Sequence, residues 1–363
     1  MAAESKNRSE SASPLADLHR ELGAHLAPYR GLDRPANYGN SKTEIESLQT
    51  GCGLFDRQGV ELFEMQGEDR HRFLNAYVTC DVKELASGRG TYGFITSAKG
   101  RILADLKVLA TEDRFFLEFP PGIGEEVVAH LTKYIIVDRV EIEHRGDLLP
   151  WTLLGPETPA TLKGLGEEFT EELAVYESRT LPVGGVEVLW VRDVDLGVPS
   201  HTLWVPVSEA EAFGRELLAS SKAPVPVGHQ ALEHLRVTAG HPLFGQDFDG
   251  ENFPKETGLE EQAVSYTKGC YLGQEVVARI HYRGGVNKSL RGLRFQQPDA
   301  EVSVPRAVLV EGREAGQMTS VASMGAEGLG LGILHKRAES GALVEVDGIG
   351  EAQVVDLPFP VEG

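Results

Sequence analysis

Cysteine is scarce in this chain. Among its 363 residues there are three, Cys52, Cys80 and Cys270, and long stretches of sequence separate them. Cysteines spaced in this way form neither a disulfide framework nor the paired thiolate ligands of a zinc or iron–sulfur site. We therefore expect no bound metal. Free thiols also suit a reducing compartment, which predicts a cytoplasmic protein.

Long apolar segments and an excess of positive charge are missing as well. No apolar run approaches the ~20 residues that span a bilayer, so we expect no membrane association. Lysine and arginine total 35 against 55 aspartates and glutamates, and the net charge of −20 argues against a nucleic-acid partner. Residues 1–14 are polar and have no hydrophobic stretch, which predicts a disordered lead-in and not a signal peptide.

The composition is otherwise that of a globular protein, with 41% hydrophobic and 25% charged residues, and the length suggests two or three domains. Strand-like and helical periodicities alternate over residues 15–240, which predicts an α+β core with two sub-lobes that divide near residue 146. Helices are expected over residues 15–26, 68–78, 123–136, 208–219 and 228–239. Strands are expected over residues 60–65, 101–109, 114–119, 140–143, 186–191 and 202–205.

The C-terminal third has a different pattern. Residues 224–226 read Pro-Val-Pro and predict a linker, and residues 241–289 predict an ordered loop that leads into a short helix over 273–280. In residues 290–363 short apolar runs alternate with glycine turns, and no helical period is convincing. This pattern predicts a small C-terminal β-barrel.

Cys270 is the first candidate for chemistry. It follows Lys268 and Gly269 and comes just before the helix expected over residues 273–280. A nearby lysine and a helix N-terminus both favour the thiolate, and a glycine lets the backbone approach a ligand closely. A buried cysteine that acts as a small hydrophobic residue would explain the same position. The local chemistry leaves both interpretations open.

Gln274 and Glu275 place an amide and a carboxylate in the first turn of the same helix. Acidic residues are common at helix starts, where they interact with the helix dipole. Glu275 also precedes Arg279 by four residues, a spacing that favours an ion pair. These structural roles compete with a role in binding.

One segment resembles the signature of a known family. It reads Lys268-Gly269-Cys270-Tyr271-Leu272-Gly273-Gln274-Glu275, and it is similar to the motif of YgfZ proteins and of the related mitochondrial iron–sulfur assembly factor. Their superfamily also includes the glycine cleavage T-protein, an aminomethyltransferase. Further pieces of the family pattern occur in the expected order over residues 53–359, among them Gly53-Leu54-Phe55-Asp56.

The resemblance implies more than the residues show on their own. It implies a GcvT-like, three-lobed α+β protein around a central cavity that holds tetrahydrofolate. It also implies a role in making or repairing iron–sulfur clusters, with iron–sulfur enzymes or assembly factors as partners and with Cys270 required for function.

Departures from the T-protein pattern bear on catalysis. T-proteins read Gly-Gly-x-x-Asp-Asp-Leu where this chain has Ala104 before Asp105, and we expect the lost carboxylate to be the catalytic one. Val198 and Thr202 stand where T-proteins have glutamates, and valine cannot replace the directed hydrogen bonds of a buried carboxylate. The positions that match the T-protein folate cavity, and so predict folate contacts here, are Tyr92, Arg236 and Asp105.

The leading prediction is a tetrahydrofolate-binding protein of the YgfZ type that supports iron–sulfur cluster assembly or repair through Cys270. One alternative is a folate-dependent aminomethyl or one-carbon transferase of the T-protein type. Another is a non-catalytic scaffold with a degenerate pocket.

Overall fold

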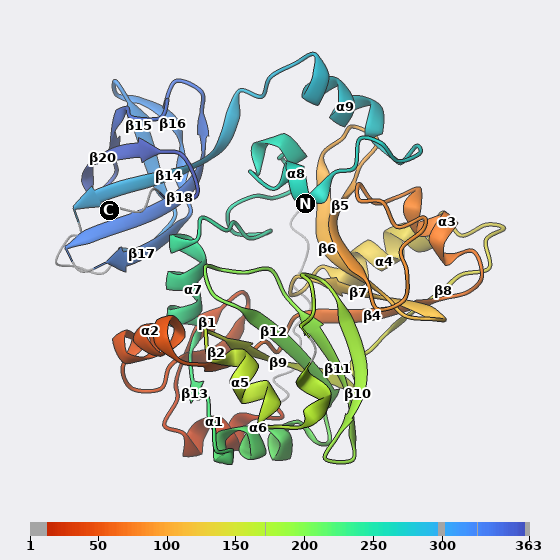
Figure 1. The fold of residues 1–363 in the computed structure, drawn as a ribbon. Helices are drawn as coiled ribbons and strands as arrows, with labels where there is room; N and C mark the ends of the chain where they lie inside the picture. The colour runs from red at the N-terminus through yellow and green to blue at the C-terminus, as the bar shows by residue number, and fades with distance from the viewer. Residues whose placement is uncertain (1–12, 171, 297–301, 325, 360–363) are drawn as a thin grey trace.

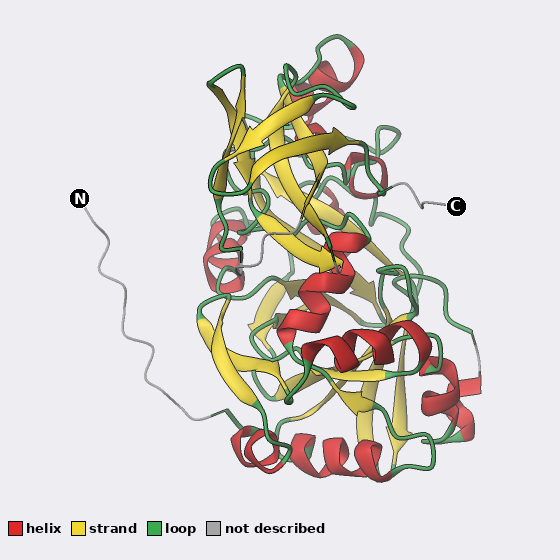
Figure 2. Cartoon of the chain, turned by 90° about the vertical axis from the view of Figure 1, so that its left-hand side faces the viewer, coloured by secondary structure: helices red, strands yellow, loops and turns green. Residues whose placement is uncertain are grey.

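The computed structural model describes residues 13–170, 172–296, 302–324 and 326–359. Three lobes surround the centre of the molecule: two antiparallel sheets with their helices and a C-terminal barrel (Figure 1). In the side view of Figure 2 the barrel strands form the upper part, and helices run across the lower part. Residues 1–12 of the expected lead-in lie outside the described residues.

The first lobe is a six-stranded sheet with helices packed on it. Its strands, in sheet order, are β10 (Ser178–Val183), β11 (Val186–Arg192), β12 (Ser200–Pro206), β9 (Leu148–Leu154), β3 (Gly53–Asp56) and β13 (Val225–Pro226). Its hydrophobic core joins the sheet to three helices through side chains such as Leu18, Trp151 and Phe213. Those helices are α1 (Ala16–Glu21), α5 (Thr158–Lys163) and α6 (Ala210–Ala219). A short 3-10 helix, η1 (Glu167–Thr170), follows α5.

Two expectations for this region are wrong. The helix predicted over residues 15–26 ends at Glu21, because Gly23 adopts a φ of +75° and turns the chain into a hairpin. That hairpin consists of β1 (His25–Tyr29) and β2 (Leu32–Asn37), and α2 (Ser41–Thr50) follows it. The predicted linker contains β13, which pairs parallel with β3 and thereby fixes the chain to the sheet.

The second lobe is a five-stranded sheet. Its strands, in sheet order, are β5 (Gly90–Thr96), β6 (Ile102–Ala110), β7 (Arg114–Phe119), β4 (Glu61–Gln66) and β8 (Glu141–His144). The hairpin predicted over 101–119 is present as β6 and β7. The helices α3 (Arg70–Asn75) and α4 (Gly124–Thr132) contribute Phe73 and Val127 to a core that also holds Ala104 and Leu106.

The chain then leaves both sheets through α7 (His229–Thr238) and a loop with short helices. These are η2 (Pro254–Glu256), α8 (Glu260–Ala263) and α9 (Gln274–Tyr282). Six strands close a barrel in the order β14 (Lys288–Gln296), β20 (Gly350–Val355), β19 (Leu343–Val346), β15 (Arg306–Val310), β16 (Arg313–Met318) and β18 (Glu327–His335). The barrel closes because β18 also pairs with β14, and β17 (Ser320–Met324) extends it along β18.

These elements confirm the predicted α+β class with a small C-terminal β-barrel. Among the described residues, no helix has both the length and the apolar character needed to cross a bilayer.

Candidate functional site

A cavity of about 200 Å³ lies where the N-terminal hairpin, both sheets and α7 meet. Its wall includes Tyr29 and Arg30 from the hairpin turn, Asp105 and Lys107 from β6, and Glu118 from β7. The remaining polar members of the wall come from several further segments of the chain: Arg34, Asp56, Arg57, Gln58, Tyr92, Thr152, Tyr176, Asp193, Ser200, Arg236 and His241. The cavity is therefore assembled from residues that are far apart in the sequence.

Asp105 is the carboxylate of this wall that forms no ion pair in the described part of the chain. Its Oδ2 accepts a hydrogen bond from the Tyr92 hydroxyl at 2.8 Å, whereas its Oδ1 is buried and has no partner among the described residues. Burial raises the pKa of Asp105 above its ordinary value, and the Tyr92 hydrogen bond and the charge of Arg30 oppose this shift only in part. A buried acceptor without a donor is costly, so this oxygen is available to a ligand.

The position of Asp105 corrects one expectation. We expected that the carboxylate missing at Ala104 was the catalytic one. Successive side chains of a strand point to opposite faces of the sheet, and Ala104 lies completely buried in the hydrophobic core of the second lobe. The neighbouring residue, Asp105, lines the cavity. The substitution at 104 thus leaves the carboxylate of the cavity in place.

Beside Asp105, two cations and two carboxylates form a closed network. Glu118 Oε1 is 2.7 Å from both Arg57 Nη2 and Lys107 Nζ. Lys107 also pairs with Asp193, whose other oxygen lies 3.6 Å from Arg57 Nη1. Although burial alone would raise it, Lys107 and Arg57 hold the pKa of Asp193 below its ordinary value. The two cations therefore favour the charged form of Asp193 within the wall.

Thr202 belongs to the same network and corrects a second expectation. We expected the absence of a glutamate at this position to remove a carboxylate from the site. The Thr202 hydroxyl instead donates to Asp193 Oδ2 at 2.5 Å, and Thr152 Oγ1 is 2.8 Å away. The wall therefore has a carboxylate at Asp193, nine residues before Thr202 in the sequence. Val198 packs against a hydrophobic cluster of the first lobe and is absent from the cavity lining.

Only a part of this network could be predicted from sequence patterns. Lys107 and Glu118 are charged residues inside strands that otherwise read as apolar, and Asp105 and Lys107 share one face of β6. That alternation was a usable signal. Asp193 and Arg57 follow strands of the other sheet, so their approach to Lys107 depends on how the two sheets meet.

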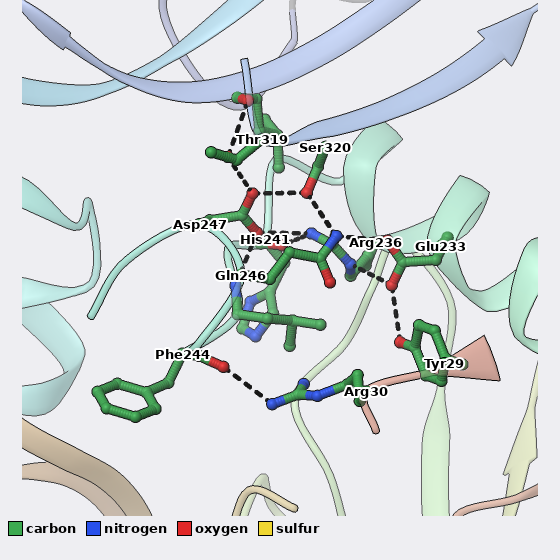
Figure 3. A network of polar contacts seen from close by, with 12 residues as sticks. Tyr29, Arg30, Glu233, Arg236, His241, Phe244, Gln246, Asp247, Thr319 and Ser320 are labelled. Carbon is green, nitrogen blue, oxygen red and sulfur yellow. Dashed lines mark hydrogen bonds and ion pairs between the residues drawn. The ribbon is translucent and has the colours of Figure 1, made fainter. Parts of the chain in front are cut away.

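Arg236 also borders the cavity, but its guanidinium is fully engaged (Figure 3). Its five N–H groups donate to Glu233 Oε1 (2.7 Å) and Oε2 (2.5 Å), Asp247 Oδ2 (2.9 Å), Ser320 Oγ (2.6 Å) and the His241 carbonyl (3.2 Å). Asp247 Oδ1 accepts hydrogen bonds from Thr319 and Ser320 at the start of β17. The predicted folate contact is thus a clasp that joins α7, the following loop and the barrel.

Segment 268–275 lies outside the cavity lining. Cys270 is exposed on the surface, while Cys52 and Cys80 are buried. Lys268 is buried, and its Nζ donates to the carbonyls of Val78 (2.7 Å) and Cys80 (2.5 Å). Burial lowers the pKa of Lys268 to about 8. Its charge is used to hold the segment against the second lobe.

The other motif residues are also positioned by the second lobe. Gly273 has a φ of +87°, and a Cβ at this point would lie 2.4 Å from the Ser97 carbonyl, so only glycine fits. The backbone of Leu272 bonds to Ala76 and to Thr96. Tyr271 is buried, whereas Gly269 is exposed with open space around it. The helix α9 begins at Gln274, four residues after Cys270. Glu275 is exposed and forms no ion pair with Arg279.

Within the described residues, no group of three or more His, Cys, Asp or Glu side chains is arranged to hold a metal ion. The groups available for chemistry are thus the carboxylates and cations of the cavity, and the thiol of Cys270.

A three-lobed α+β fold of this kind is found in a solved structure, that of the glycine cleavage system aminomethyltransferase T from Bartonella henselae. The two folds agree with a TM-score of 0.85 at 22% identity, over 96% of this chain and 97% of that one. The sequence model of the GCVT N-terminal domain matches residues 15–268, and the chain belongs to this family.

Curated relatives match along nearly the whole chain. An aminomethyltransferase from Rubrobacter xylanophilus is 28% identical over 354 residues, which cover 96% of this chain and 93% of the relative. One from Bacillus subtilis is 25% identical over 361 residues, with 96% and 98% coverage. These relatives agree with the match to the GCVT N-terminal domain, and the YgfZ-type resemblance rests on the sequence motifs.

Proposed function

We propose that the central cavity binds a reduced folate and that the protein is a folate-dependent one-carbon transferase of the aminomethyltransferase type. The observation that carries this proposal is Asp105, a carboxylate in the cavity wall with a raised pKa and one oxygen without a hydrogen-bond donor. Relatives that span the chain bear the name aminomethyltransferase, which supports the same reaction class.

The chemistry requires a proton carrier. When an aminomethyl group is passed from a thiol to tetrahydrofolate, a methylene bridge forms between two folate nitrogens, and ammonia and the free thiol are released. The two folate nitrogens lose two protons, and the leaving amine and thiol each gain one. A carboxylate that contacts the folate nitrogens can accept such a proton and return it. This exchange is easier when the pKa of the carboxylate is raised toward neutral pH. Asp105 lines the cavity and has a raised pKa, which supports this role.

The charge network next to Asp105 contributes a fixed environment. Arg57, Lys107, Glu118 and Asp193 balance one another, so this network is polar without a net charge. Glu118 Oε2 is buried and has no partner in the described part of the chain, which adds a second free acceptor. A pterin ring carries several N–H donors, and two free carboxylate oxygens are suited to them.

The test measures binding and turnover in the same variants. Tetrahydrofolate binding is followed by calorimetry, and the reverse reaction by the loss of methylenetetrahydrofolate in the presence of ammonium and a thiol. Asp105→Asn should remain folded and lower turnover by about 100-fold or more, because general acid–base groups contribute on that scale. The exposed Asp347→Asn serves as the control. Unchanged turnover in Asp105→Asn, or no folate binding by the unaltered protein, would refute the proposal.

A second candidate function rests on a separate observation. Cys270 is the exposed thiol of the three, and the surrounding segment is held in place by Lys268, Leu272 and Gly273. An accessible, well-positioned thiol suits the YgfZ-type role in iron–sulfur cluster assembly or repair. Cys270→Ser should then fold normally and fail to complement a defect in an iron–sulfur enzyme. The same complementation assay with Asp105→Asn shows whether this role depends on the folate reaction. Full complementation by Cys270→Ser would remove this candidate.

A further inference from the structure

The cations in the cavity wall differ in how they are neutralised. Four of them form ion pairs with carboxylates: Arg34 with Asp56 (3.5 Å), Arg57 with Glu118 (2.7 Å), Lys107 with Glu118 (2.7 Å), and Arg236 with Asp247 (2.9 Å). The fifth, Arg30, makes one hydrogen bond, from Nη2 to the Phe244 carbonyl at 2.9 Å. Within the described part of the chain no carboxylate pairs with it.

Arg30 lies in the turn of the β1–β2 hairpin. Tyr29 and Leu32 are the last paired residues of β1 and β2, and Arg30 and Gly31 form the turn with φ values of +50° and +81°. Positive φ at both turn residues is the geometry of a tight two-residue hairpin, and it is uncommon for arginine. The turn therefore places an arginine where glycine or asparagine is usual.

The Arg236 clasp fixes this hairpin to the rest of the wall. Tyr29 donates from its hydroxyl to Glu233 Oε1 at 2.8 Å, and Glu233 is bound to Arg236. The Tyr29 ring also stacks on His229, with centroids 4.4 Å apart and planes 4° from parallel. Figure 3 shows Tyr29 and Arg30 side by side below this network. The guanidinium of Arg30 is thereby held beside the ligand space, where its charge acts on Asp105 but forms no ion pair within the described residues.

Arg30 also stands at a boundary between two spaces. Together with Tyr29, Pro120 and Pro121 it lines both the central cavity and a larger outer groove of about 940 Å³. The groove is bordered further by α7 and by barrel residues such as Val321. A ligand that enters the cavity from this groove passes Arg30.

Two charged groups of the wall therefore form no ion pair with any described residue, and they have opposite signs: Arg30 and Asp105. A ligand with N–H groups at one end and a carboxylate at the other would satisfy both. We infer that Arg30 binds a carboxylate of the ligand while Asp105 contacts its nitrogen-bearing end. This inference rests on the proposed function and deepens it, because it assigns the anionic part of the ligand to a residue of the hairpin.

Such a carboxylate has two sources. One is the glutamyl tail of the folate, and the other is a small amino acid that brings the one-carbon unit. Both present the planar group that an arginine binds with two parallel hydrogen bonds. The inference is about the shared carboxylate, and the experiment separates the sources.

The experiment compares three probes in calorimetric titrations: tetrahydrofolate, 6-methyltetrahydropterin, which has a reduced ring but no carboxylate, and glycine. The variants are Arg30→Gln and Arg30→Lys, and Arg313→Gln is the matched control because Arg313 is exposed on β16 away from both spaces. Arg30→Gln should weaken the binding of a carboxylate-bearing probe by about tenfold or more. Arg30→Lys should recover part of that loss, and the affinity for the pterin should stay within about twofold.

A loss confined to tetrahydrofolate identifies the glutamyl tail, and a loss confined to glycine identifies an amino acid. Unchanged affinity for every probe in Arg30→Gln overturns the inference and leaves the proposed function intact. Binding of glycine but no folate by the unaltered protein, with loss of glycine binding in Arg30→Gln, overturns the proposed function and leaves the inference about Arg30 standing. If none of the three probes binds, both are wrong.

Discussion

The central cavity and segment 268–275 are organised in opposite ways. The cavity wall draws its charged groups from the N-terminal hairpin, both sheets and α7, and two of those groups, Arg30 and Asp105, remain outside any ion pair. The segment is continuous in sequence, and its lysine is consumed by backbone carbonyls while its cysteine lies on the surface. The ligand space is thus built from scattered residues, whereas the continuous motif is held against the second lobe.

The largest expected effect concerns the clasp behind the cavity. Arg236→Met would leave Glu233 and Asp247 without their buried counter-charge, so it should lower the free energy of unfolding by about 3–5 kcal/mol. Urea denaturation measures the change. The exposed Arg313→Met should alter stability by less than about 0.5 kcal/mol. Equal effects of the two variants would show that the clasp does not hold the lobes together.

The same cysteine-to-serine substitution can be made at a buried position, Cys80, and within segment 268–275, at Cys270. Cys80→Ser places a hydroxyl in a buried hydrophobic cluster and should cost about 1–3 kcal/mol of stability. Cys270→Ser changes an exposed side chain and should cost less than about 0.5 kcal/mol. Thermal and urea denaturation of the two proteins provide the test. A cost at Cys270 as large as that at Cys80 would mean that the thiol packs against the protein.

A smaller effect is expected within the charge network. Thr202→Val keeps the shape of the side chain but removes the donor to Asp193, which still has Lys107 and Arg57. The loss should be about 1 kcal/mol, the typical net contribution of one hydrogen bond. Thr152→Val, which removes the neighbouring hydroxyl, is a matched variant that leaves Asp193 its donor. A loss above about 3 kcal/mol would indicate that Thr202 is essential to the network.

The smallest net change in the free energy of unfolding near neutral pH is expected for Lys268→Met. This substitution removes the hydrogen bonds of Lys268, but it also removes the cost of its buried charge. The pKa of Lys268 is lowered by burial from its ordinary value of 10.5 to about 8. The unfolded chain therefore binds more protons than the folded one between these values, and stability rises with pH across that window. The rise should disappear in Lys268→Met and persist in Lys288→Met, as measured by urea denaturation from pH 7 to 10. Persistence in both would exclude Lys268 as its cause.

Much of the fold could be predicted from periodicity. The β6–β7 hairpin, α7 and the barrel follow from local patterns, because each element is amphipathic or glycine-punctuated on its own. The β1–β2 hairpin could not be, because Pro28 and Pro35 argue against strands. Prolines are tolerated there since the hairpin is a separate two-stranded sheet whose strands are both edges.

The site was predictable only in part. Tyr92, Asp105 and Arg236 do gather at the cavity, but the sequence could not indicate that every donor of Arg236 is occupied. The pair of Lys107 and Asp193 joins residues 86 positions apart on different sheets, and only the meeting of the sheets brings them together. Arg30 stood out in no motif. Its importance became visible only in the structure, where the other cations of the cavity wall form ion pairs and Arg30 does not.

The claim that the cavity, rather than segment 268–275, is the ligand site is tested most directly by a crystal structure with bound 5-formyltetrahydrofolate. We predict that the pterin ring lies against Asp105 and that a carboxylate of the ligand contacts Arg30. Folate bound beside Cys270 and Lys268, with the cavity closed to it, would contradict the assignment.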